Sequence, residues 1–187
     1  VLVPAAGRGE RLGPGMPKAL RPLGGIPMLV HAVRALAASR IVDIVVVAAP
    51  EDSAEMVAAM LAEQSFQAEV VVVTGGDTRQ DSVARALLTL PDDVDVVLVH
   101  DAARPLVPVE VVTAVAAAVR AGNDAVVPGL PVVDTIKRVD ASSDVECTVD
   151  RAPLRAIQTP QGFRRQVLQH AHASADPGDG SATDDAG

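Results

Sequence analysis

Residues 41–48 read IVDIVVVA, a run of branched aliphatic side chains interrupted by one acid and soon followed by Pro50. Such a run is typical of a β-strand, and the near absence of polar alternation indicates a strand buried on both faces, as in a parallel sheet. Similar runs alternate along the chain with stretches that have helical spacing. The other strand-like runs are 1–4, 69–74, 95–100 and 125–128, and the helix-like stretches are 26–39, 51–64, 77–90 and 108–121. This alternation predicts an α/β protein with a mostly parallel, doubly wound sheet.

Length and charge narrow the class of protein. The 187 residues predict one domain, 1–187, and the net charge of −8 argues against a nucleic-acid or acidic-membrane binder. The single cysteine, Cys147, provides neither a disulfide framework nor a thiolate zinc site. Because no apolar run approaches ~20 residues and no signal peptide is present, we expect a cytoplasmic protein. The chain opens at Val1 within a strand-like run and ends at Gly187 without a stop signal, so we expect it to be truncated at both ends.

The β-α rhythm changes in the last third of the chain. From Val132 to Arg151 the sequence VVDTIKRVDASSDVECTVDR alternates apolar and polar residues around a polar tip at 140–144, which predicts a β-hairpin. A lone hairpin is only marginally stable in water, so this one either docks on a second subunit or folds over its own domain. After the hairpin we expect a strand at 156–161 and a helix at 163–173.

A glycine-rich, cationic loop follows the first strand. It reads AAGRGERLGPGMPK over residues 5–18, and residues 7–21 carry a net charge of +3 whereas the other 172 carry −11. Ligands of doubly wound sheets bind beyond the carboxyl ends of the strands, where backbone N–H groups of a glycine loop can close around phosphate oxygens. The spacing fits neither G-x-G-x-x-G, which would need glycine at Leu12, nor a P-loop. The loop therefore predicts a polyphosphate ligand of another kind.

This loop resembles the signature of the sugar- and alditol-phosphate nucleotidyltransferases, because A-A-G-x-G-x-R-L-G is followed by Pro-Lys. The later motifs are similar, in order, to those of the 2-C-methyl-D-erythritol 4-phosphate cytidylyltransferases. They are GGDTRQDSV at 75–83, VHDAARP at 99–105, DTIK at 134–137, TPQ at 159–161 and TDDA at 183–186. The resemblance implies a three-layer, Rossmann-like nucleotidyltransferase sheet with a protruding β-arm at about 132–151. It also implies a transferase of the non-mevalonate isoprenoid pathway that moves CMP from CTP to methylerythritol phosphate and releases pyrophosphate.

The same resemblance assigns site residues. The family pattern places two catalytic cations at Arg11 and Lys18. Because CTP brings Mg²⁺ with its own phosphates, we expect Mg²⁺ as a cofactor held mainly by those phosphates, with no direct protein ligand. The nucleotide site is implied for Ala5, Ala6, Gly7, Gly9, Gly76, Asp77, Ser82, Asp101 and Ala102. The alditol phosphate site is implied for Asp101, Arg104, Thr135, Arg151 and Thr159. In the family Arg151 and its hairpin reach into the partner subunit's site, which implies a homodimer. The family pattern also has a late lysine, in a final strand near the substrate phosphate, and the sequence ends at Gly187 before that position.

Simpler interpretations remain for several of these residues. Asp101 could form only an ion pair with Arg104, Asp77 or Thr78 could be a helix cap, and Lys18 could be a solvated surface charge. We expect His100 to be a packed or hydrogen-bonded neighbour rather than a base. Three other functions also remain: a ribitol 5-phosphate cytidylyltransferase, an enzyme that uses another nucleotide, and a non-catalytic nucleotide-binding regulatory domain.

Overall fold

A six-stranded sheet in the order β5-β4-β1-β6-β12-β7 forms the centre of the computed structural model, which describes residues 1–7, 16–174 and 185–186. Its strands are β1 (Leu2–Pro4), β4 (Ile44–Ala49), β5 (Glu69–Thr74), β6 (Val96–Val99), β7 (Ala125–Val126) and β12 (Gln161–Arg164). Strands β5, β4, β1 and β6 pair in parallel, whereas β12 is antiparallel to both of its neighbours. The expected mostly parallel α/β sheet is confirmed.

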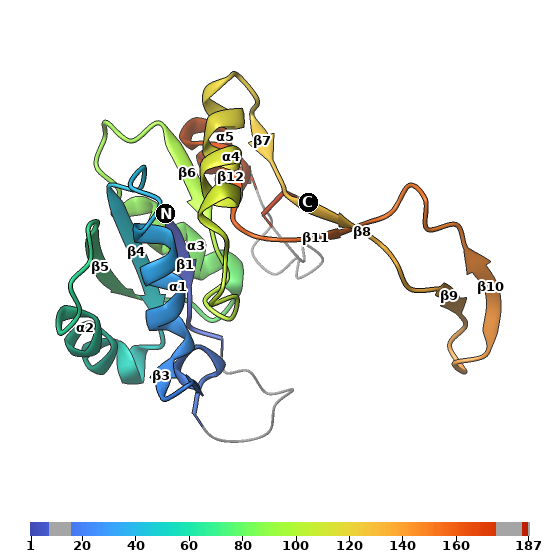
Figure 1. Ribbon diagram of the computed structural model, residues 1–187, viewed down its shortest axis with the longest axis horizontal. Coiled ribbons are helices and arrows are strands. Elements are labelled where there is room, and N and C mark those ends of the chain that lie inside the picture. Colours follow the sequence, from blue (N-terminus) through green and yellow to red (C-terminus); the bar gives the residue numbers. More distant parts are fainter. Residues whose placement is uncertain (8–15, 175–184, 187) are drawn as a thin grey trace.

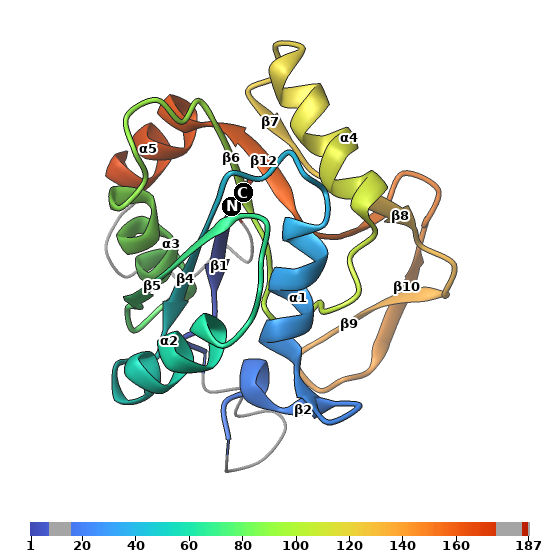
Figure 2. The ribbon, with the colours of Figure 1, turned by 60° about the vertical axis from the view of Figure 1, so that its left-hand side comes forward.

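Helices cover both faces of this sheet (Figures 1 and 2). They are α1 (Met28–Ala37), α2 (Ala54–Ala62), α3 (Arg79–Leu88), α4 (Val109–Arg120) and α5 (Arg165–Ser174), with short 3-10 helices η2 (Lys18–Leu20) and η3 (Glu51–Ser53). Side chains alternate across a strand, so each face has its own core. Val3, Val45 and Val47 pack with α1, α2 and α4, whereas Leu2 and Val46 pack with α3 and α5. The result is the three-layer architecture that the family resemblance implies.

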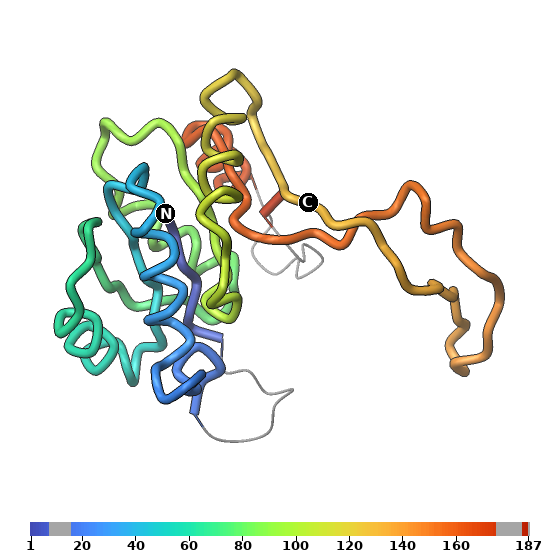
Figure 3. The backbone as a smooth tube through the Cα atoms, in the orientation of Figure 1, coloured from blue at the N-terminus to red at the C-terminus, as the bar shows by residue number. Residues whose placement is uncertain are grey.

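The chain leaves the sheet after β7 and returns at β12, and the excursion between them projects from the body of the molecule (Figures 1 and 3). The expected hairpin is present as β9 (Ile136–Val139) and β10 (Val145–Val149), closed by a hydrogen bond from Asp140 N to Asp144 O. At its base β8 (Gly129–Pro131) pairs with β11 (Arg155–Ile157). The β-arm therefore spans residues 129–157 and is longer than the expected 132–151, because β8 and β11 extend its base. A small pair, β2 (Pro22–Leu23) and β3 (Ile26–Pro27), precedes α1.

Two expectations for the end of the chain are wrong. The strand expected at 156–161 is instead β11 in the β-arm, and the main-sheet strand is β12, which begins after a cis peptide between Thr159 and Pro160. Phe163 lies in β12 and not in a helix, because its buried ring packs between the sheet and the α3–α5 layer. The helix itself begins at Arg165.

Local boundaries differ slightly elsewhere. The strand expected from Ile41 begins at Ile44. At the start of α3 the cap is Thr78 and not Asp77: Asp81 N donates to Thr78 Oγ1 at 3.0 Å, and Thr78 N donates to Asp81 Oδ2 at 3.2 Å. This reciprocal capping box fixes the first turn of α3. In the described part of the chain, no helix has both the length and the apolar character needed to cross a bilayer.

Candidate active site

The loops that follow β1 and β5 meet at the carboxyl edge of the sheet. Ala5 N donates to Ala48 O at 2.8 Å and Gly75 N to Ala49 O at 2.7 Å, so both loops continue the hydrogen bonding of the sheet. A Cβ atom on Gly75 would lie 2.6 Å from Ala6 Cβ and 2.9 Å from Ser82 Oγ, a space that only glycine can fill.

The second glycine of this loop closes the contact with α3. Gly76 N donates to Ser82 Oγ at 3.1 Å, and a Cβ atom on Gly76 would lie 2.2 Å from Asp81 Cβ. Asp77 is exposed beside it. The structure thus brings Ala5, Ala6, Gly76 and Ser82 together as the sequence predicts. Gly7, at the end of the first described segment, is exposed.

A second cluster surrounds Asp101, which follows β6 at the same edge. Its Oδ2 accepts a hydrogen bond from Arg104 Nε at 3.1 Å, and its backbone N donates to Thr159 Oγ1 at 3.2 Å. Arg104 Nη1 also donates to Gln158 Oε1. Asp101, Arg104 and Thr159 therefore lie in one hydrogen-bonded group, and the neighbouring Ala102 is buried in the core.

His100 is buried beneath this group and contacts two of its members, Arg104 and Thr159. The ring is fully buried, with Nε2 3.0 Å from Arg104 O and Nδ1 3.0 Å from Thr159 Oγ1. Because a carbonyl oxygen only accepts, Nε2 carries the proton and Nδ1 accepts from the Thr159 hydroxyl. Burial lowers the pKa of His100 below its ordinary 6.5. His100 is a neutral hydrogen-bonded neighbour, as expected.

Sequence reasoning gave no role to Arg79, which the structure places between two carboxylates. Its Nη1 lies 2.6 Å from Asp185 Oδ2 and its Nη2 lies 3.2 Å from Asp101 Oδ1. Asp185 N in turn donates to Oε1 of the buried Gln161 at 3.1 Å. These residues belong to the GGDTRQDSV, VHDAARP, TPQ and TDDA motifs, so a signal was present, but the sequence alone does not place the motifs side by side.

Burial and charge oppose each other in this group. Burial raises the pKa of Asp185, and the guanidinium of Arg79 opposes that rise. Burial alone would lower the pKa of Arg79, but Asp185 and Asp101 outweigh it, so the pKa is raised and Arg79 stays charged. Burial also lowers the pKa of His172, on α5.

Lys18 is the described member of the predicted catalytic pair. It starts η2 and is exposed, while Ala19 and Leu20 behind it are buried in the core and hold the turn in place. Arg11 and Gly9, like Arg8 and the Thr183-Asp184 part of the TDDA motif, lie outside the described residues.

Thr135 and Arg151 are not brought to the Asp101 group within one chain. Both are exposed on the β-arm, which stands away from the carboxyl edge of the sheet (Figure 1). Arg151 donates to Val133 O within the β-arm. Across the described residues, no hydrogen bond or ion pair joins either of them to Asp101, Arg104 or Thr159.

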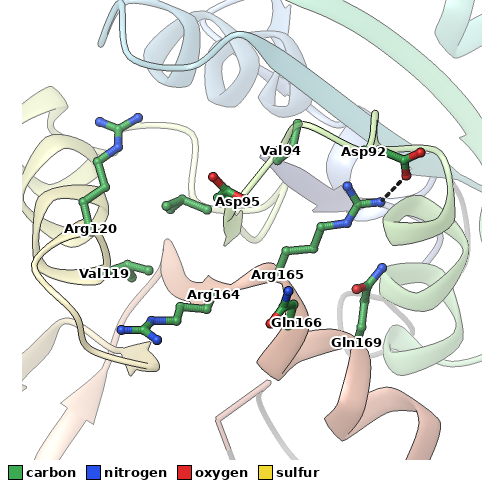
Figure 4. A pocket seen from close by; sticks show the side chains of 10 residues that line it. Asp92, Val94, Asp95, Val119, Arg120, Arg164, Arg165, Gln166 and Gln169 are labelled. Carbon is green, nitrogen blue, oxygen red and sulfur yellow. Dashed lines mark ion pairs between the residues drawn. The ribbon is translucent and has the colours of Figure 1, made fainter.

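A cavity of about 590 Å³ lies elsewhere, where α4, α5 and the amino end of β6 meet (Figure 4). Two of its three arginines are paired: Arg165 lies 3.7 Å from Asp92, and Arg164 lies 3.4 Å from Asp124, whereas the third, Arg120, is exposed. None of the predicted site residues lines it. The candidate site is therefore the carboxyl edge with its Asp101 group and glycine loops, and not this cavity.

A doubly wound sheet with a glycine loop at 75–76 and a paired acid–arginine group at its carboxyl edge is typical of ligand-binding α/β proteins, and the motifs gathered at this edge are those that resemble the nucleotidyltransferases. The model of the 2-C-methyl-D-erythritol 4-phosphate cytidylyltransferase family matches residues 1–187. The chain belongs to this family and is a cytidylyltransferase.

Individual relatives agree with this assignment. The chain is 57% identical over 186 residues to the 2-C-methyl-D-erythritol 4-phosphate cytidylyltransferase of Frankia casuarinae, covering 100% of this chain and 67% of the relative. It is 54% identical over 192 residues to that of Streptomyces coelicolor, covering 98% and 68%. The crystal structure of the Thermus thermophilus enzyme has a TM-score of 0.75 and 36% identity, over 99% of this chain and 80% of that one.

Proposed function

We propose that this chain transfers CMP from CTP to 2-C-methyl-D-erythritol 4-phosphate, giving 4-diphosphocytidyl-2-C-methyl-D-erythritol and pyrophosphate. The observation that carries the proposal is the joining of Asp101, Arg104 and Thr159 into one group beside the loop at 75–82. This arrangement gives a nucleotide and an anionic acceptor adjacent places at one edge of the sheet.

The chemistry needs alignment rather than a protein nucleophile. An oxygen of the acceptor's phosphate monoester attacks the α-phosphorus of CTP, a new P–O bond forms, and the bond from the α-phosphorus to the bridging oxygen breaks as pyrophosphate leaves. Lys18 and Arg11 stabilise the charge that develops on the phosphoryl oxygens. Because the monoester is itself an anion at neutral pH, no side chain has to remove a proton from it.

Backbone and small side chains recognise the cytosine in this proposal. The chain has no Trp or Tyr to stack on a base. Ala5, Ala6 and Gly7 line one side of the pocket, and Gly76, Asp77 and Ser82 line the other, because the contact between Ala6 and Gly75 places their loops together. The backbone of Asp101 and Ala102 faces the ribose and triphosphate in this proposal, because the Ala102 side chain is buried and both carboxylate oxygens of Asp101 already accept from guanidinium groups.

The acceptor site is shared between two subunits. Arg104 and Thr159 hold the alditol phosphate from one chain, while Thr135 and Arg151 reach it from the β-arm of the partner, which makes the enzyme a homodimer. Exposed apolar side chains support a partner for the β-arm: Val133 is 77% exposed, Val145 61% and Leu130 58%. Apolar surface of this kind is stabilised when a second subunit covers it.

Mg²⁺ enters the proposal with CTP. Within the described residues, no three His, Cys, Asp or Glu side chains converge to hold a metal ion, and each oxygen of Asp101 already accepts from a guanidinium. The residues that the structure describes therefore do not fit a dedicated magnesium site, and no step of the mechanism passes through one. Separately, because CTP and a small alditol phosphate are metabolites of the cytoplasm, we propose that the enzyme acts in the cytoplasm.

Initial rates of pyrophosphate release test this proposal. We expect turnover with CTP and methylerythritol phosphate, and much lower kcat/KM with ATP, GTP or UTP. Ribitol 5-phosphate, offered in place of methylerythritol phosphate, distinguishes the nearest alternative. Turnover of ribitol phosphate alone would reject the assigned acceptor, and binding of CTP without turnover of either acceptor would favour a regulatory domain.

A further inference from the structure

We propose that Arg79 is a positioning residue of the transfer reaction, which fixes Asp101 and, through it, the acceptor-binding guanidinium of Arg104. This inference rests on the proposed function. It follows from the place of Arg79 between the buried carboxylate of Asp185 and the half-exposed carboxylate of Asp101.

The backbone of Arg79 is held independently of the contacts of its side chain. Arg79 is the first residue of α3, and the capping box between Thr78 and Asp81 holds that turn. Its side chain is 32% exposed, whereas that of Asp185 is 3% exposed. The shorter contact, 2.6 Å to Asp185, therefore anchors one end of the guanidinium and directs the other end toward Asp101.

Arg79 also determines which oxygen of Asp101 is left for Arg104. Oδ1 accepts from Arg79 Nη2 at 3.2 Å and Oδ2 accepts from Arg104 Nε at 3.1 Å, so the plane of the carboxylate is held from both sides. Thr159 fixes the backbone of Asp101 as well. Without Arg79 the carboxylate can rotate, and Arg104 loses a defined partner.

Arg104 is left with donors for a ligand. Its Nε binds Asp101 and its Nη1 binds Gln158, whereas Nη2 has no partner among residues 1–7, 16–174 and 185–186. The side chain is 40% exposed. A guanidinium that is held at two nitrogens, and whose third nitrogen has no partner among these residues, suits a phosphate oxygen of the acceptor.

A purely structural role for Arg79 makes a different prediction. If Arg79 only attached Asp185 to α3, its loss would lower the melting temperature and would affect both substrates alike. If Arg79 positions Arg104, its loss raises KM for methylerythritol phosphate while KM for CTP stays nearly unchanged.

Four variants decide between these roles: Arg79→Ala, Arg79→Lys, Asp185→Asn, and Arg120→Ala as a control that removes one exposed cation remote from the site. We expect Arg79→Ala to raise KM for methylerythritol phosphate by roughly tenfold or more, and KM for CTP by less than about twofold. Arg79→Lys should rescue little of this, because a single ammonium nitrogen lacks the planar fork whose two nitrogens reach Asp185 and Asp101 separately. Asp185→Asn should give a smaller shift of the same kind, and combining it with Arg79→Ala should add nothing, because both act on one contact.

Equal changes in both KM values, or a lower melting temperature with unchanged kinetics, would overturn the proposal. Should Arg79→Ala fail to fold, Arg79→Lys and Asp185→Asn carry the same comparison. Calorimetric titration with methylerythritol phosphate separates this inference from the proposed function. Weaker binding by Arg79→Ala supports the positioning role even if the wild type makes no product, whereas a wild type that neither binds nor turns over this acceptor overturns both.

Discussion

His100 connects three parts of the site through one neutral ring. Its Nε2 donates to Arg104 O, its Nδ1 accepts from Thr159, and Thr159 Oγ1 accepts from Asp101 N. A second proton on the ring would turn Nδ1 into a donor and force the Thr159 hydroxyl to rotate. The ring thus stabilises the site only in its neutral form.

The stability of the protein should therefore fall in mild acid. Burial holds the pKa of His100 below the 6.5 of the unfolded chain, so the unfolded state takes up the proton first as the pH drops. This contribution is complete above about pH 6.5 and is lost as the pH falls toward the folded pKa. We expect His100→Gln to flatten the decline in unfolding free energy between neutral and mildly acidic pH, by at most about 1.4 kcal/mol per pH unit.

Urea denaturation at a series of pH values measures this effect. His170→Gln, a change at an exposed histidine on α5, is the matched control and should keep the wild-type profile. His172 also has a pKa lowered by burial, so part of the decline remains in His100→Gln. Identical profiles for wild type and His100→Gln would show that His100 is not a stabilising neutral group.

Lys18 should matter for rate and not for folding. Its side chain is exposed and has no hydrogen-bond or ion-pair partner among the described residues. Lys18→Ala should lower kcat by roughly 10²–10³, as removal of one preorganised charge typically does, and should leave the melting temperature unchanged. Single-turnover measurements with saturating substrates test this. A variant with wild-type kcat would exclude Lys18 from charge stabilisation.

Among the elements, β12 shows how tertiary pairing overrides local pattern. The segment QGFR is short and polar at both ends, and its Phe163 belongs as readily to the following helix as to a strand. Only pairing with β6 on one side and β7 on the other makes it a strand, and neither partner is near it in sequence. By contrast, the apolar run of β5 is enough to predict a strand from the sequence alone, and the predicted bounds of β5 are confirmed.

Gly162 lets β12 lie close beneath α4. A Cβ atom on Gly162 would lie 2.6 Å from Val115 Cγ1 and 3.0 Å from Val119 Cγ2. We expect Gly162→Ala to lower the unfolding free energy by about 1–3 kcal/mol through overpacking. Adding Val115→Ala should recover part of the loss, because it removes the nearest atom. Thermal and urea unfolding measure both changes.

The control for this pair is Thr113→Ala on the exposed side of α4, which should be nearly neutral. Independent, additive losses from Gly162→Ala and Val115→Ala would contradict the close contact between β12 and α4.

The candidate site was predictable only in part, because some of its contacts join residues that are far apart in the sequence. Asp101, Arg104 and Thr159 stand in motifs whose order resembles a known family, and the structure joins them. Arg79 and Asp185, which form an ion pair, are 106 positions apart in the sequence, so no local spacing of residues predicts their contact. His100 likewise takes its role from Thr159, 59 residues away, and not from its neighbours.

At the scale of the whole molecule, the β-arm sets Thr135 and Arg151 apart from the rest of the predicted acceptor site. If the site is shared between two subunits, two inactive variants should complement each other. We expect Arg151→Ala and Lys18→Ala to be nearly inactive alone, and co-expressed with different tags to recover about a quarter of wild-type activity. Random pairing makes half of the dimers mixed, and each mixed dimer has one intact site.

Activity of the unfractionated mixture measures this complementation, and mixed dimers purified through both tags should have about half of wild-type activity, because one of their two sites is intact. Arg151→Ala paired with Arg104→Ala is a second test, because these residues belong to opposite chains of one site. No recovery in either mixture, with mixed dimers present, would show that Arg151 serves its own chain. A monomer in sedimentation experiments at assay concentrations would contradict the shared site directly.

Isotope labelling of the phosphate oxygens tests most directly whether the acceptor phosphate attacks the α-phosphorus of CTP. With ¹⁸O in the phosphate of methylerythritol phosphate and unlabelled CTP, ³¹P NMR and mass spectrometry of the products show which bond has formed. Attack on the α-phosphorus predicts 4-diphosphocytidyl-2-C-methyl-D-erythritol that retains all of the label, with one labelled oxygen bridging its two phosphorus atoms, and unlabelled pyrophosphate. Label in pyrophosphate, or no cytidylylated product, would contradict attack on the α-phosphorus.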